Sequence, residues 1–132
     1  MLVLTMGTAM VVATIGLGAV WAARMRLRDV QTSTQVLEAR AYAQSAIELG
    51  LLRIRDTPNW RTTPGPGMWV ANLSLGHGTC TLTTSTIADG DADPYNDDWL
   101  FMGTGISGDA VRKIELTLVD GKLLGEWKQK VD

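Results

Sequence analysis

The stretch VLEARAYAQSAIELGLLRI, residues 36–54, carries an apolar stripe built mainly from small side chains. Its apolar positions recur every three or four residues, the spacing that gathers side chains on one face of an α-helix. The polar residues Glu38, Arg40 and Glu48 fall largely off that face. Because small side chains let another surface approach closely, we expect this helix to cover the core. The stripe consists of Val36, Ala39, Ala43, Ala46, Ile47, Gly50 and Ile54.

The helix is expected to extend well beyond this stretch. Pro58 follows Asp56 closely and ends it, because proline lacks the amide proton and restricts the residue before it. On the other side, nothing forces a break between Ala23 and Asp29. Residues 1–56 are therefore predicted to form one continuous helix. The alternative is a membrane span followed by a separate core helix.

The first 23 residues, MLVLTMGTAMVVATIGLGAVWAA, contain no charged side chain. As a helix rising about 1.5 Å per residue, they cover roughly 34 Å, enough for a hydrocarbon core of about 30 Å. A buried soluble helix of this length would show a polar face, and a signal peptide would begin with positive charge. Trp21 stands where an interfacial aromatic side chain belongs. The segment predicts a membrane-spanning helix.

The charges of the chain are unevenly distributed. The formal net charge is −2, yet residues 1–28 carry only Arg24, Arg26 and Arg28, so the remainder carries −5. A mildly acidic body is not expected to bind nucleic acid. The positive-inside rule places these arginines and the body in the cytoplasm. That orientation reverses if a charged leader has been removed, so both orientations stay open.

The segment after the helix is expected to form a small antiparallel sheet. Residues 56–67, DTPNWRTTPGPG, form a proline-rich loop, and Asp120-Gly121 is a strong hairpin signal. Ile114, Leu116 and Leu118 alternate with polar residues, which suits a sheet covered on one face. The predicted strands are Met68 to Leu75, Thr79 to Ile87, Trp99 to Gly103, Ala110 to Val119, and Lys122 to Val131.

These segments predict an α+β fold, in which a long N-terminal helix packs on a small antiparallel β-sheet. The helix has a membrane half and an amphipathic half. Residues 1–28 are expected to form the transmembrane or filament-core half of the helix. Residues 29–132 are expected to form the α+β head domain.

No cluster of residues predicts catalysis. GTGISG, residues 103–108, matches a dinucleotide-binding pattern, but the residues that follow alternate like a strand and do not open a helix. These glycines are predicted to form a hairpin turn. Cys80 is the lone cysteine, expected to be buried, and with His77 it cannot complete a zinc site. We therefore expect a protein that is not an enzyme.

The stretch DGDADPYNDD, residues 89–98, is dense in oxygen ligands of the kind that Ca²⁺ binds. It begins like an EF-hand loop but lacks that loop's glycine and its last glutamate. The same residue types are common in solvated turns, which remains the alternative. The candidate calcium ligands are Asp89, Asp91, Asp93, Asn96, Asp97 and Asp98.

The order of these segments resembles that of type IV pilin-like proteins, a group that includes minor pilins and type II secretion pseudopilins. The resemblance rests on the apolar helix entering ARMRLRDVQTSTQVLEARAYAQSAIELGLLRI, with its alanine spacing and late Glu, and on DGDADPYNDDWLFMGTGISGDAVRKIELTLV. It implies a helix that is extracted from the bacterial inner membrane into a filament core, and a head on the filament surface. It also implies that an acidic loop can hold Ca²⁺. Thr5 stands where major subunits carry a Glu that pairs with a neighbour's N-terminal amine, a departure that a tip or initiating subunit would tolerate.

The favoured hypothesis is a structural subunit of a pilus-like or pseudopilus filament, with other pilin-like subunits and the inner membrane as partners. Its head would lie outside the cytoplasm, in the periplasm or on an extracellular filament. The alternative is a single-pass, membrane-anchored binding module that does not polymerise and that calcium stabilises. Close helix packing is expected at small residues of the first helical half. These assembly residues are Thr5, Gly7, Ala9, Ala13, Gly16, Gly18 and Ala22.

Overall fold

The computed structural model describes residues 2–88, 90, 93, 96–119, 122–123 and 128–130. Side chains are described within these ranges except at residues 2–6, 8, 122–123 and 128–130. The chain divides into two compact units, Met1–Thr34 and Gln35–Asp132. The first is helical, and the second contains the rest of that helix and the sheet.

One helix, α1 (Leu2–Asp56), runs through the first unit and into the second. It ends where Pro58 was expected to end it, and the amide of Thr57 still donates to the carbonyl oxygen of Arg53 at 3.0 Å. Arg53 and Arg55 in the last turn oppose the negative end of the helix dipole. The prediction of one continuous helix is confirmed.

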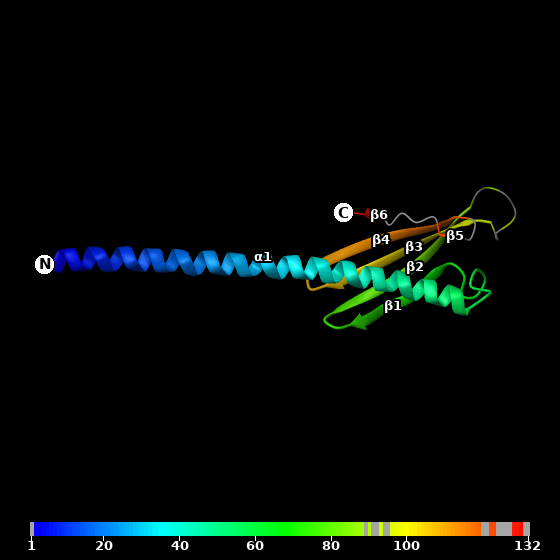
Figure 1. The fold of residues 1–132 in the computed structure, drawn as a ribbon, viewed down its shortest axis with the longest axis horizontal. Coiled ribbons are helices and arrows are strands. Elements are labelled where there is room, and N and C mark those ends of the chain that lie inside the picture. The colour runs from blue at the N-terminus through cyan, green and yellow to red at the C-terminus, as the bar shows by residue number, and fades with distance from the viewer. Residues whose placement is uncertain are drawn as a thin grey trace. The chain divides into compact units, whose positions relative to one another are not determined.

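The sheet is an antiparallel meander of four long strands with two short strands beside the last of them (Figure 1). Neighbours follow the order β1-β2-β3-β4-β5, and β6 also pairs with β4. The pair Val119 with Lys122 brackets the Asp-Gly hairpin signal, whose own residues lie outside the described residues. The strands are β1 (Gly67–Leu75), β2 (Gly78–Ile87), β3 (Asp98–Ser107), β4 (Ala110–Val119), β5 (Lys122–Leu123) and β6 (Lys128–Lys130).

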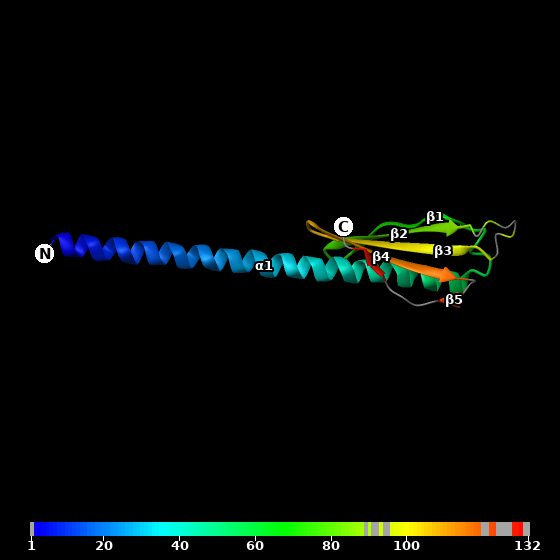
Figure 2. The same ribbon diagram turned by 90° about the horizontal axis from the view of Figure 1, so that it is seen from above.

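The second half of α1 lies along one face of this sheet (Figure 2). The stripe predicted from the sequence is the covered face: Ala39, Ala43, Ala46 and Ile47 have no exposed surface. Alternate residues of β4, among them Leu116, supply the facing apolar surface. The predicted α+β fold, a long helix on a small antiparallel sheet, is confirmed.

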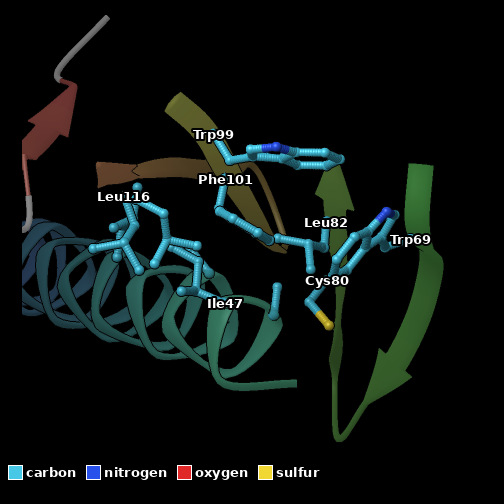
Figure 3. Packing of buried hydrophobic residues seen from close by; sticks show 11 residues of the cluster. Ile47, Trp69, Cys80, Leu82, Trp99, Phe101 and Leu116 are labelled. Atoms are coloured by element: carbon cyan, nitrogen blue, oxygen red, sulfur yellow. The ribbon is translucent and has the colours of Figure 1, made fainter. Parts of the chain in front are cut away.

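Aromatic rings fill the core at the far end of this helix, where Figure 3 shows Trp99, Phe101 and Trp69 around Leu82. Trp60, from the loop after α1, meets Trp99 edge-to-face at 4.8 Å between ring centroids. Trp69 meets Phe101 in the same way at 5.4 Å. The indole nitrogen of Trp69 donates to the carbonyl oxygen of Gly65 at 2.7 Å, which fixes the proline-rich loop onto the core.

The glycines of GTGISG, residues 103–108, do not all lie in the hairpin turn predicted for them. Gly103 and Gly105 are not in a turn, because β3 continues to Ser107 and both glycines are buried within it. They face α1, where a β-carbon on either glycine would overlap the helix backbone at Ala39 or Ala43. Gly108 alone stands in the β3–β4 turn, with a positive φ of 55°. The pattern serves close helix–sheet packing, and the predicted hairpin turn is wrong for its first two glycines.

Candidate assembly and membrane interface

The first half of α1 exposes an apolar surface that no described part of the protein covers. From Ala9 onward the helix contains a stretch long and apolar enough to cross a membrane, and none of that stretch is buried inside the protein. This stretch overlaps residues 1–23, which the sequence predicts as membrane-spanning, and the helix fits that role by length and composition. The large side chains exposed here include Met10, Val11, Val12, Ile15, Leu17, Val20 and Trp21.

The small residues predicted for assembly fall on two sides of this helix, about half a turn apart at about 100° per residue. One side, called the Ala9 face, carries Ala9, Ala13 and Gly16. The opposite side, called the Gly18 face, carries Gly7, Gly18 and Ala22.

No described atom packs against the glycines of either face. A β-carbon added at Gly7, Gly16 or Gly18 would meet no atom within 4 Å. These glycines therefore serve no packing purpose inside the described part of the chain. Thr5 falls near the Ala9 face by its helical position, and its side chain lies outside the described residues.

The hydroxyl group of Thr14, in this half of the helix, forms its hydrogen bonds within the helix. Thr14 donates to the carbonyl oxygens of Met10 and Val11, at 3.1 and 2.8 Å. Such a return to the preceding turn lets a polar side chain enter an apolar medium without an unpaired group. Thr5 and Thr8 lie in the same apolar run, and their side chains are outside the described residues.

Charge begins just past the apolar half, around a shallow hollow on the helix surface. Trp21, Arg24, Met25 and Arg28 line this hollow. Their spacing of three and four residues puts them on one face of the helix. Both kinds of group that favour a membrane–water boundary, an indole and guanidinium groups, therefore meet at one place.

The head retains a second exposed apolar set on α1, opposite the stripe that covers the sheet. Leu37 is 66% exposed, Leu52 is 47% exposed and Leu49 is 37% exposed. The stripe predicted from the sequence does not include these leucines. Reading the same helix for a second apolar set off the first stripe would have found them. They offer a partner helix apolar surface within the head itself.

The structure does not test the prediction that residues 89–98 bind calcium. Asp89 and Asp91 lie outside the described residues. Asp93 is exposed, whereas Asn96, Asp97 and Asp98 are half-buried at the start of β3. The backbone oxygen of Asp97 accepts a hydrogen bond from Arg61 at 3.4 Å. Among the described residues, no three His, Cys, Asp or Glu side chains gather closely enough to hold a metal ion.

Cys80, His77 and Glu38 lie in the head, apart from the exposed apolar half of α1. Cys80 is fully buried against the helix, and burial raises the pKa of its thiol. His77 is exposed in the turn between β1 and β2. Glu38, which the sequence places off the stripe, is half-buried and accepts a hydrogen bond from the buried hydroxyl of Ser107 at 2.6 Å. Glu38 therefore ties the helix to the end of β3.

No family model, curated protein or solved structure matches this chain.

Proposed function

We propose that this chain is a structural subunit of a type IV pilin-like filament, a pilus or a secretion pseudopilus, that assembles through the first half of α1. The proposal assigns it no catalytic role. Before assembly, the same helix anchors the protein in the inner membrane with its head outside the cytoplasm. The partners are other pilin-like subunits, either copies of this chain or different chains.

The observation that carries the proposal is the placement of small residues on two opposite faces of an apolar helix. Small residues let helix backbones approach closely in an apolar medium, where packing drives association. The Ala9 face and the Gly18 face each offer such an approach, and no described atom fills the space beside Gly16 or Gly18. A closed dimer needs one such face, whereas a chain of subunits needs two different faces.

The head supports the same reading. The exposed side chains of Leu37, Leu49 and Leu52 extend apolar surface onto the half of α1 that covers the sheet. A helix that packs against neighbouring subunits along its length would bury this surface, whereas a helix that acts only as an anchor would leave it in water. The non-polymerising, membrane-anchored module remains the second candidate, favoured by a helix that is long and apolar enough to anchor a head by itself.

The test places a large side chain on the Ala9 face and on the Gly18 face in separate variants. We expect Gly16→Leu on the Ala9 face and Gly18→Leu on the Gly18 face each to abolish co-purification of two differently tagged copies from membranes. Filaments seen by electron microscopy of the sheared cell-surface fraction should disappear with them. Leu17→Phe, which adds bulk between the faces at a side chain that is 77% exposed, should preserve both readouts.

Membrane insertion is measured in parallel by flotation with lipid vesicles. If all three variants insert and the wild-type copies never co-purify with one another or with other pilin-like subunits, the membrane-anchored module replaces the filament subunit.

A further inference from the structure

Two arginines on one face of α1 have no acidic partner among the residues that the structure describes. Arg24 and Arg28 are four residues apart, and like charges at this spacing repel one another on a helix. The residues one turn away from them are apolar, polar and uncharged, or the other arginine. Among the described residues, no ion pair is formed by either guanidinium group; the described ion pair joins Arg55 and Asp56. This arrangement is more stable with an anion bound between the two side chains.

Arg26 provides an internal contrast. It points about 160° away from Arg24 around the helix, and Asp29 lies one turn further along on its own side. Arg26 also does not line the hollow, which is bounded by Trp21, Arg24, Met25 and Arg28. Three arginines within five residues therefore divide into a pair around an apolar hollow and a single residue elsewhere.

The position along the helix decides what kind of anion reaches the pair. The uncharged run ends at Ala23, and Trp21 within it is 66% exposed. An indole ring is stable at the boundary between acyl chains and headgroups. With Trp21 at that boundary, Arg24 lies about 4.5 Å and Arg28 about 10 Å further along the axis, among the lipid phosphates.

We propose that Arg24 and Arg28 bind the phosphate of one anionic phospholipid, with Trp21 and Met25 contacting its glycerol and upper acyl region. A planar guanidinium group donates two parallel hydrogen bonds to a phosphate, so two such groups can hold one headgroup from both sides. The bound phosphate also removes the repulsion between the arginines. The inference rests on the membrane-anchoring part of the proposed function and does not depend on filament assembly.

The test uses the full-length chain released from lipid nanodiscs that contain phosphatidylglycerol and phosphatidylcholine with identical acyl chains. Native mass spectrometry counts the lipids retained per chain. We expect preferential retention of one phosphatidylglycerol. Arg24→Gln and Arg28→Gln should each lower the ratio of retained phosphatidylglycerol to phosphatidylcholine about tenfold, the effect of one charged hydrogen-bonding partner. Arg26→Gln is the matched control and should leave the ratio unchanged.

Equal loss of phosphatidylglycerol from the Arg26 and Arg24 variants would mean diffuse attraction to a negative surface and would overturn the site. Displacement of the lipid by inorganic phosphate would make it a site for free phosphate and would overturn the lipid assignment. Equal retention of both lipids by the wild type would do the same. Flotation with phosphatidylcholine vesicles separates these outcomes from failure of the anchor, because a wild-type chain that does not float contradicts the proposed function itself.

Discussion

Gly105 of β3 lies against the backbone carbonyl of Ala39 in α1, with no space between them for a β-carbon at position 105. The helix can approach the sheet this closely because Ala39 and Ala43 present only methyl groups and because the strand opposite them presents only hydrogen atoms. The contact lies near the end of β3, two residues before Ser107. It sets the distance between the two layers of the head.

Gly105→Ala is expected to lower the free energy of unfolding by about 2–3 kcal/mol, because the added methyl group must push the helix backbone away from the sheet. Thr104→Ala is the control, because Thr104 is half-buried on the opposite face of β3. It should cost less than about 1 kcal/mol. Thermal unfolding followed by circular dichroism measures both. Equal stability of the Gly105 variant and the wild type would mean that the two layers are further apart than described.

A charged side chain placed on the buried or on the exposed face of the helix provides a second test. Ala43→Arg should unfold or strongly destabilise the head, because Ala43 has no exposed surface and the guanidinium group would be buried without a partner. Ala41→Arg places the same side chain on the exposed side of the same helix and should change the melting temperature little. Similar melting temperatures for the two variants would show that the stripe faces solvent or another subunit.

The periodic features of this fold could be predicted from the sequence. The three-and-four spacing that includes Ala43 and Ile47 determined which helix face is buried, and the alternation around Leu116 determined the matching strand face. Both patterns are local, because the repeat of a helix or strand is visible within one segment. The end of the helix near Pro58 was predictable for the same reason.

The glycine-rich end of β3 was not predictable in this way. Glycine favours turns in an isolated segment, so Gly103 and Gly105 were assigned to a hairpin. Their actual role depends on the backbone of Ala39 and Ala43, some sixty residues earlier in the chain. For the candidate interface, the small residues are a prediction from the sequence, whereas their division into two faces and the hollow beside Trp21 follow from the continuous helix.

The buried thiol of Cys80 should make stability depend on alkaline pH. Burial raises its pKa above the ordinary value of 9.0. Below that pH both folded and unfolded chains keep the proton, and no dependence arises. Above it the unfolded chain releases the proton first, so the stability contributed by the neutral thiol falls as pH rises. The melting temperature of the wild type relative to Cys80→Ala should therefore stay constant well below pH 9.0 and fall as the pH rises above that value.

The same burial should protect Cys80 from iodoacetamide in the folded chain and expose it after unfolding. Mass spectrometry of the alkylated protein checks this. Rapid alkylation of the folded chain would place the thiol at the surface and contradict the packing of β2 against the helix.

A calcium titration distinguishes the two alternatives for residues 89–98, a calcium site and a solvated turn. If Asp91 and its neighbours bind calcium, the ion stabilises the folded form and raises the melting temperature relative to a chelator. Mg²⁺ should substitute poorly because it keeps its waters and requires a stricter octahedron. Asp91→Ala should remove the calcium response and leave the head folded. Identical melting curves in calcium and chelator assign the stretch to a solvated turn.

Removal of residues 1–23 should leave a soluble, folded head. The buried hydrophobic side chains of the described core begin at Ala39, so among the described residues the deletion removes exposed apolar surface and no member of the core. The full chain should need detergent or lipid, whereas the shortened chain should elute as a monomer with the same near-ultraviolet signal from its buried tryptophans. Removal of residues 1–45 is the matched control: it also takes away Ala39 and Ala43, uncovers Gly103 and Gly105, and should give insoluble protein. Insoluble protein from the shorter deletion as well would show that the first half of α1 belongs to the core and would refute its role as an anchor.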